Sequence, residues 1–194
     1  MSELSPESVL PLLRGRLGKP YRFVASCPST QRLLAEDEPE GATVVTDHQT
    51  QGRGRLGRRW EAPPRRAILC SVLLRPPAPM PLWPELTLVA GNSVAAALRA
   101  ETGVEASLRH PNDVVVSGRK LAGVLAEARP GRVTLGIGVN VNQSAAELPQ
   151  DAAKPPTSLR LELEREVERA PLLAAILLEL ERAYDVWSAA YRRE

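Results

Sequence analysis

The residues best suited to chemistry lie in an arginine- and glycine-rich stretch, GRGRLGR, at residues 52–58. Its glycines can expose backbone N–H groups, and the guanidinium groups of Arg53, Arg55 and Arg58 can each bind phosphate through two parallel hydrogen bonds. The surrounding segment, 50–66, is polar and has no hydrophobic period, which is typical of a functional or disordered loop. Taken alone, the stretch fits a loop that closes over a polyphosphate, a solvated basic loop, or a nucleic-acid contact.

The same stretch matches the G-x-G-x-x-G pattern at Gly52, Gly54 and Gly57, but its context argues against a dinucleotide site. A dinucleotide fold needs a helix that begins inside the loop and an acidic residue about 20 positions later. Here Pro63–Pro64 follow closely and position 77 is a proline. The sequence also contains no G-x-x-x-x-G-K-[ST] motif.

A second group of polar residues begins at RHPND, residues 109–113. Asn112 and Asp113 stand at an expected elbow before a strand, where Asp113 could bind Mg²⁺, although Pro-Asn-Asp is also a common turn. Lys120 opens the apolar segment KLAGVLAE, so we expect it at a sheet edge, either in a site or as a solvated strand end. Gly123 would let a ligand approach the backbone closely.

A third group lies in TLGIGVN. Gly136 and Gly138 alternate along an expected strand that ends at Asn140. Because alternate residues of a strand share one face, these glycines would leave an open slot on that face.

Other catalytic arrangements are not indicated. His48 and His110 lack the spacing of zinc ligands, and no G-x-S-x-G motif occurs. Cys27 and Cys70 have no signature around them and are expected in the core.

Hydrophobic periodicity predicts the elements that hold these residues. Strands are expected at 21–27, 42–49, 67–76 and 106–108, and in the successive segments VVVSG, KLAGVLAEA and RVTLGIGVNV. Helices are expected at 6–17, from a Ser29 cap to Glu36, at 85–102 with Gly103 as its C-cap, after Ser158, and from 171 to about 192. This order predicts an α/β or α+β fold with a central mixed sheet flanked by helices.

The composition is that of a globular protein. The chain has 194 residues, 43% of them hydrophobic, and a formal net charge of +2. That charge is too small to indicate nucleic-acid binding by itself. We find no signal peptide and no apolar run long enough to span a membrane, so we expect a cytoplasmic location.

Together these motifs resemble the catalytic domain of the biotin protein ligase family. The resemblance rests on Ser29-Thr30-Gln31, Gln49, the run from Gly52 to Trp60, Pro111-Asn112-Asp113, Lys120 to Gly123, and Gly136 to Asn140, in the family's order. It covers about residues 20–190. It implies an α+β fold of the class II aminoacyl-tRNA synthetase/biotin ligase type, with residues 1–194 as one domain.

The resemblance implies a reaction in two steps. Biotin and ATP, with Mg²⁺, form biotinyl-5′-AMP and pyrophosphate, and a lysine of a biotin carboxyl-carrier protein then accepts the biotin. The implied catalytic residues are Lys120, Arg55 and Asp113, with Asp113 as the metal ligand.

The resemblance also implies the residues of each binding site. The expected biotin contacts are Ser29, Thr30, Gln31, Gln49, Gly52, Arg53, Gly54, Arg55, Lys120, Gly123 and Gly136. The expected ATP or adenylate contacts are Arg53, Arg55, Arg58, Trp60, Asn112, Lys120 and Asn140, with Trp60 stacked on the adenine.

The chain departs from the family pattern in two respects. Where the family usually has Lys-Trp-Pro-Asn-Asp, this sequence has Arg109-His110 before Pro111. We also expect neither an N-terminal winged helix nor a C-terminal β-barrel, and therefore no direct DNA binding. Exposed sheet edges near 114–139 are compatible with a homodimer.

Three alternatives remain open from the sequence. A lipoate or octanoate protein ligase or transferase resembles biotin ligases in fold and chemistry, but the GRGRLGR loop, KLAG and Gln49 favour biotin. A nucleic-acid-binding module built on the basic loop is disfavoured by the small net charge. A non-catalytic relative is suggested by His110.

Overall fold

The computed structural model describes residues 2–150, 152 and 154–192, and the strands within them form one seven-stranded mixed sheet. The strands are β1 (Tyr21–Val24), β2 (Thr43–Thr46), β3 (Ala67–Leu74), β4 (Ser107–Arg109), β5 (Asp113–Val116), β6 (Arg119–Arg129) and β7 (Arg132–Asn140). Their order is β1-β2-β3-β7-β6-β5-β4, with β1 and β2 parallel and the other neighbours antiparallel. The predicted mixed sheet is confirmed.

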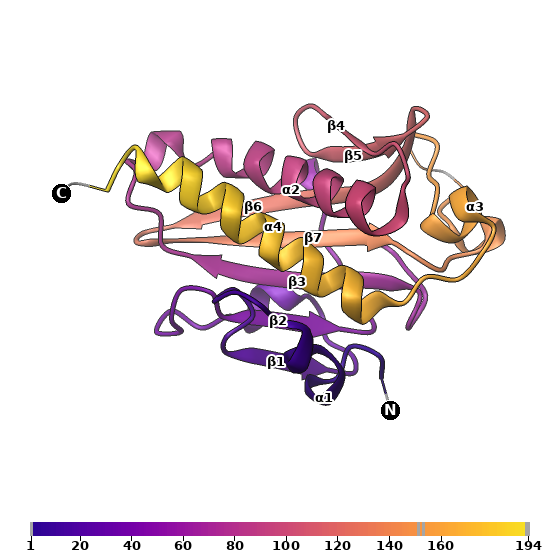
Figure 1. Ribbon diagram of the computed structural model, residues 1–194, viewed down its shortest axis with the longest axis horizontal. Coiled ribbons are helices and arrows are strands. Elements are labelled where there is room, and N and C mark those ends of the chain that lie inside the picture. The colour runs from indigo at the N-terminus through magenta and orange to yellow at the C-terminus, as the bar shows by residue number, and fades with distance from the viewer. Residues whose placement is uncertain (1, 151, 153, 193–194) are drawn as a thin grey trace.

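The helices are α1 (Pro6–Val9), α2 (Glu85–Thr102), α3 (Leu159–Leu163) and α4 (Arg169–Ala189). Figure 1 shows the two long helices, α2 and α4, lying together against one face of the sheet. The bounds of α2 match the predicted 85–102, and Gly103 ends it with a φ of 76°, as a left-handed cap requires. No helix among the described residues is long and apolar enough to cross a membrane.

The alternation of residues in β7 separates the core from the opposite face of the sheet. Leu135, Ile137 and Val139 are buried in the hydrophobic cluster that also contains residues of α2 and α4. Gly136 and Gly138 point the other way, because successive residues of a strand face opposite sides. The helices thus cover one face, and the other is left to the polar residues that the sequence singled out.

Two expected helices are wrong in extent. The helix expected at 6–17 ends at Val9 and continues only as a 3-10 turn, Leu10–Leu12, because Pro11 has no N–H to continue the hydrogen-bond ladder. The helix expected after Ser29 is a single 3-10 turn, Thr30–Leu33, and the Ser29 side chain does not cap it.

The position expected for Lys120, at a sheet edge, is also wrong. Lys120 pairs with Val115 of β5 on one side, and on the other it forms a parallel bridge with Pro156. The prediction that Cys27 and Cys70 lie in the interior is confirmed, since both are buried and free.

Candidate active site

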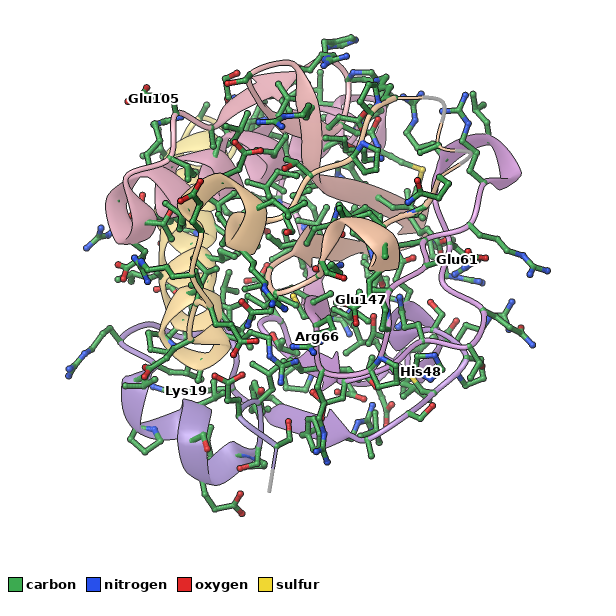
Figure 2. The ribbon with its side chains drawn as sticks, turned by 90° about the vertical axis from the view of Figure 1, so that its right-hand side faces the viewer. Lys19, His48, Glu61, Arg66, Glu105 and Glu147 are labelled. Carbon is green, nitrogen blue, oxygen red and sulfur yellow. The ribbon has the colours of Figure 1, made fainter. Side chains whose placement is uncertain are left out.

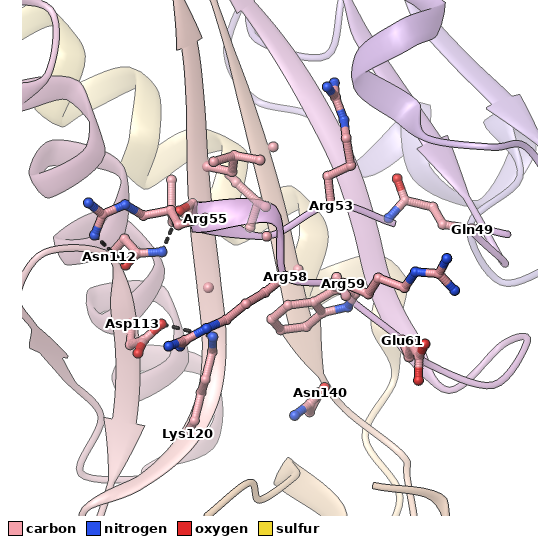
Figure 3. Close-up of a pocket in the computed structure, with 18 of the residues that line it drawn as sticks. Gln49, Arg53, Arg55, Arg58, Arg59, Glu61, Asn112, Asp113, Lys120 and Asn140 are labelled. Atoms are coloured by element: carbon pink, nitrogen blue, oxygen red, sulfur yellow. Dashed lines mark hydrogen bonds and ion pairs between the residues drawn. The ribbon is translucent and has the colours of Figure 1, made fainter. Parts of the chain in front are cut away.

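A cavity of about 610 Å³ gathers most of the residues that the sequence singled out. Ser29, Thr30, Gln31 and Gln49 line it together with Arg53, Gly54, Arg55, Arg58, Trp60, Asn112, Asp113, Lys120, Gly123, Gly136 and Asn140. In Figure 3, Gln49 and Arg53 lie at one end, and Asn112, Asp113 and Lys120 lie at the other. The structure therefore brings the separate motifs into one place.

One end of the cavity offers neutral hydrogen-bonding groups. The Thr30 amide and hydroxyl both donate to Gln49 Oε1, at 2.8 and 3.2 Å, and Thr30 Oγ1 lies 2.6 Å from Ser71 Oγ. Ser29 and Thr30 are each only 2% exposed. These bonds fix the carbonyl end of the Gln49 amide and leave its NH₂ group as a donor toward the cavity lining.

The middle of the cavity contains the indole of Trp60. Gly123 of β6 and Gly138 of β7 are directly paired, and Trp60 lies over both of them. A Cβ at Gly138 would come within 2.5 Å of the indole, so only glycine leaves room for the ring. The Lys120 ammonium lies 5.4 Å from the ring centroid, a distance that allows a cation–π interaction.

The open slot expected over Gly136 and Gly138 is therefore wrong. Trp60 covers Gly138, and the Gln31 side chain covers Gly136, with its Cδ 3.0 Å from where a Cβ would be. The Gln31 amide donates to the carbonyl oxygens of Leu125 and Thr134, at 3.1 and 3.3 Å, which fixes it on the sheet.

The arginine loop is a tightened hairpin. Arg53 and Arg59 form an antiparallel bridge, the Gly54 amide donates to Arg58 O, and the Trp60 amide donates to Gly52 O. A side chain at Gly52 would collide with the carbonyl oxygen of Trp60. These contacts hold Trp60 over the sheet. The predicted loop is confirmed, but its base is ordered by backbone pairing.

The tip of this hairpin is exposed, in contrast to its base. Leu56 has a φ of 57° and is 87% exposed. Arg55 donates to Asn112 Oδ1 at 3.4 Å, and Arg53 donates to Glu127 Oε2 at 2.8 Å. Glu127 on β6 thus anchors one side of the loop to the sheet.

The other end of the cavity is an ionic cluster around Asp113. Lys120 Nζ lies 2.9 Å from Asp113 Oδ1, and Lys154 Nζ lies 2.5 Å from Oδ2. Burial by itself raises the pKa of the Asp113 carboxyl, but hydrogen bonds and positive charge from Lys154 and Lys120 outweigh this effect and lower its pKa. Asp113 is therefore an anion at neutral pH.

This cluster does not fit a magnesium ion held by the chain. Both carboxylate oxygens of Asp113 already accept from ammonium groups. Among the described residues, no group of three or more His, Cys, Asp or Glu side chains is placed to hold a metal. Mg²⁺ prefers several oxygen ligands, and this end of the cavity offers mainly cations. The geometry therefore supports Asp113 as the partner of the two lysines rather than as a metal ligand.

Asn140 is tied to neighbouring segments. Its Nδ2 donates to Thr157 O at 2.9 Å, and its Oδ1 accepts from Gln143 Nε2 at 2.9 Å. It lines the cavity but is only 5% exposed. These contacts indicate that Asn140 positions the segment around residue 157.

Sequence reasoning missed three residues of the site. They are Ser71 beside Thr30, Glu127 beside Arg53 and Lys154 beside Asp113. Ser71 and Lys154 lie outside the motifs, Glu127 ends the segment KLAGVLAE without a signal of its own, and each contacts its partner across a long sequence separation. Arg109, which stands at the first position of the altered motif, donates to the Gly118 carbonyl and is not among the described residues that line the cavity.

Comparisons with known proteins agree with this geometry. Residues 23–144 match the model of the biotin/lipoate A/B protein ligase family. A bifunctional ligase/repressor BirA from Bacillus spizizenii is 36% identical over 167 residues, covering 83% of this chain and 51% of the relative. A biotin–[acetyl-CoA-carboxylase] ligase from Mycobacterium tuberculosis is 39% identical over 163 residues, covering 82% and 60%.

A solved structure of a biotin protein ligase is also similar to this chain. A biotin protein ligase from Aquifex aeolicus in complex with biotin and ATP is 34% identical, with a TM-score of 0.78, covering 86% of this chain and 71% of that one. The expected fold class is thereby confirmed. The chain spans about half to three-fifths of the length of the two curated relatives named above. The chain belongs to the biotin/lipoate A/B protein ligase family.

Proposed function

We propose that this chain uses ATP to convert biotin to biotinyl-5′-AMP and then transfers the biotin to a lysine of a biotin carboxyl-carrier protein. The observation that carries the proposal is the difference in polarity between the two ends of the cavity of about 610 Å³. Neutral hydrogen-bonding groups around Thr30 and Gln49 lie at one end, beside Arg53, whose charge is paired with Glu127. Lys120 and Lys154 lie at the other end. Biotin has the same polarity, with a neutral ureido ring at one end and a carboxylate at the other.

The electrostatics suit a reaction between two anions. Six basic and two acidic side chains line the cavity, a surplus of four positive charges, although Arg53 is paired with Glu127. ATP carries a similar negative charge near neutral pH. In the first step the biotin carboxylate attacks the α-phosphorus, and the bond to the leaving pyrophosphate breaks. Preorganised cations stabilise the charge that develops between the two anions.

The residues of the cationic end have distinct proposed tasks. Lys120 lies between the Trp60 indole and Asp113, so its ammonium can neutralise the carboxylate and the α-phosphate together. Arg55 and Arg58 bind phosphate oxygens when the loop closes, with Asn112 orienting Arg55. Asp113 orients Lys120 rather than a metal ion.

The neutral end supports biotin recognition by the 3-10 turn and Gln49. The biotin ureido group has two N–H donors and one carbonyl acceptor, which the hydroxyl groups of Ser29 and Thr30 and the amide of Gln49 can match. The indole of Trp60 presents an apolar wall beside the glycine pair. Its Nε1–H is buried and finds no acceptor among the described residues, so an oxygen of the ligand would satisfy it. Stacking of adenine on Trp60 uses the side of the ring that faces away from the glycines.

In the second step the amine of the carrier lysine attacks the carbonyl carbon of the mixed anhydride. An amide bond forms, the bond to the phosphate oxygen breaks, and AMP leaves. The attacking amine must lose a proton, because lysine is normally protonated near neutral pH.

The alternative substrate, lipoate or octanoate, fits the neutral end less well. A dithiolane ring or an alkyl chain offers no acceptor for the Gln49 NH₂ group, whose carbonyl oxygen is already bonded to Thr30. Burying this donor under an apolar ligand without a partner costs free energy. The cavity therefore favours a ligand with a polar ring.

The proposed function is tested by incubating the chain with labelled biotin, ATP, Mg²⁺ and a carrier domain. We expect stable label on the carrier that is lost when its acceptor lysine is replaced by alanine. Label that appears only with lipoate or octanoate would contradict the proposal, and absence of any transfer would indicate a non-catalytic relative.

A further inference from the structure

Lysine is rare in this protein, yet two lysines meet at one carboxylate. Of the 25 basic residues only three are lysines: Lys19, Lys120 and Lys154. Lys120 and Lys154 both contact Asp113, one through each carboxylate oxygen. Because arginine supplies almost all other positive charge, the pairing of two lysines here is a specific feature of the site.

Backbone hydrogen bonds of the residues that follow Lys154 fix its position. The Lys120 amide donates to Pro155 O at 2.7 Å, and the Thr157 amide donates to Lys120 O at 2.8 Å. The residues after Lys154 therefore pair with the first residues of β6, and Asn140 holds Thr157 from the other side. Pro155, directly after Lys154, disfavours a helical conformation of the Lys154 backbone.

The charge at this cluster exceeds what Asp113 needs. One ammonium already neutralises the carboxylate, whose side chain is only 5% exposed. The second ammonium leaves a surplus positive charge close to Lys120, and like charges held near each other repel. Lys154 keeps two further N–H donors after bonding to Asp113, and it lines the cavity.

We infer that Lys154 is a second phosphate-binding ammonium, held on Asp113 and directed at the β- and γ-phosphates of ATP. Asp113 then acts as a positioning residue that spaces Lys120 and Lys154 for two parts of one polyanion. A single carboxylate, such as that of biotin, could not neutralise the surplus of positive charge in the cavity. A nucleoside triphosphate can. This inference rests on the proposed function for the identity of the nucleotide.

The second positive charge beside Asp113 does not come from Arg109, the basic residue of the RHPND segment that contains Asp113. Arg109 lies three residues before Asn112, but its guanidinium is bonded to the Gly118 carbonyl in the turn between β5 and β6. Lys154 approaches Asp113 from a segment 41 residues later in the chain. The cluster therefore gains its second ammonium from a different part of the sequence.

The inference is tested by binding α,β-methylene-ATP, which cannot release pyrophosphate, and AMP, each with and without biotin, using calorimetry. Lys154→Ala should weaken α,β-methylene-ATP binding about ten- to hundredfold, the loss expected for one charge-assisted contact. AMP binding should change by less than about twofold, because AMP lacks the β- and γ-phosphates.

Two further variants keep the result interpretable. Lys154→Arg retains the charge and should recover most of the affinity for α,β-methylene-ATP. Lys19→Ala removes the remaining lysine, which is exposed beside the N-terminal helix and, in Figure 2, on the opposite side of the molecule from the cavity residue Glu61. It should leave both affinities unchanged. Melting temperatures of all variants check that the fold is intact.

The outcomes separate this inference from the proposed function. Unchanged α,β-methylene-ATP affinity in Lys154→Ala overturns it, and so does an equal loss of AMP affinity, which would place Lys154 at the α-phosphate. No triphosphate binding by the unmodified chain also overturns it. If the triphosphate result holds but biotin neither binds nor is adenylated, the inference stands and the proposed substrate is wrong.

Discussion

At the scale of single residues, Lys120 is the group on which the adenylation step depends most. It is flanked by Asp113 and Trp60, so its ammonium has one defined position in the cavity. Lys120→Ala should reduce adenylation about a hundredfold or more, as removal of a preorganised charge-stabilising donor does elsewhere. The melting temperature should change little, because Lys154 still neutralises Asp113. Pyrophosphate release and thermal unfolding measure the two effects, and a variant with normal turnover would refute the role of Lys120.

Gly138 tests the placement of the Trp60 indole. Gly138→Ala puts a methyl group into the ring, so the indole must move. We expect about a tenfold or greater loss of biotin affinity, equivalent to about 1.4 kcal/mol, measured by calorimetry. Gly103→Ala is a suitable control, because its Cβ would meet nothing within 4 Å although its φ is positive.

The control variant should separate stability from binding. Gly103→Ala should lose about 1–2 kcal/mol of stability, since a non-glycine residue is strained in the left-handed region. Its biotin affinity should stay normal. Equal biotin affinities in Gly138→Ala and the unmodified chain would show that the indole does not shape the biotin site.

The lowered pKa of Asp113 predicts that the stability of the fold depends on pH. Its pKa is lowered in the folded chain relative to the ordinary value of 3.8, so its stabilising effect is fully present above that value. The effect is lost as the pH falls through the lower folded pKa. Asp113→Asn should therefore lower the melting temperature at about pH 7, and the difference should shrink at about pH 3. A difference that does not depend on pH would contradict the ionic account of this cluster.

At the scale of elements, the loop of residues 50–66 has an ordered base and an exposed tip. Backbone pairing and the Arg53–Glu127 contact hold the base, and Leu56 at the tip is exposed. Trypsin should cut after Arg55 or Arg58 without ligands, and biotin with ATP should slow this cleavage as the arginines bind phosphate. Glu127→Gln should speed the cleavage without ligands. Identical digestion with and without biotin and ATP would count against closure of the tip.

Elements with strong local signals were predictable from the sequence. The bounds of α2 followed from its apolar period and Gly103, and β6 and β7 followed from their apolar runs and the turn between them. The helix after Ser29 failed because Thr30 bonds to Gln49 and Ser71, partners that lie far away in the sequence. Tertiary contacts therefore determined the backbone conformation of this segment, because its local helix propensity was weak.

The site residues also differ in whether a local sequence signal or a tertiary contact defines them. Residues within motifs, such as Lys120 and Asn112, were found because their order and spacing are distinctive. Lys154 was not found, since a lysine before two prolines has no local signal and acquires its meaning only by pairing with β6. Gly136 and Gly138 share the predicted face of β7, but the open slot over them was wrong, because no pattern indicated that Gln31 and Trp60 would fill it.

At the scale of the whole molecule, the sheet separates stability from chemistry. Helices α2 and α4 bury one face, and the opposite face carries the cavity with its neutral and cationic ends. Substitutions on the helix face should therefore act on stability, and those on the cavity face should act mainly on ligand binding. Trp60 and the Gly123–Gly138 pair connect the two ends, so a ligand that spans the cavity must pass the indole.

We propose that this cavity joins biotin to the AMP part of ATP and releases pyrophosphate. The most direct test is release of pyrophosphate from ATP by the purified chain with biotin, lipoate or octanoate as the only acid. We predict rapid release with biotin, formation of biotinyl-5′-AMP in equal amount, and little release with the other two acids. Release that depends on lipoate or octanoate but not on biotin would contradict the account.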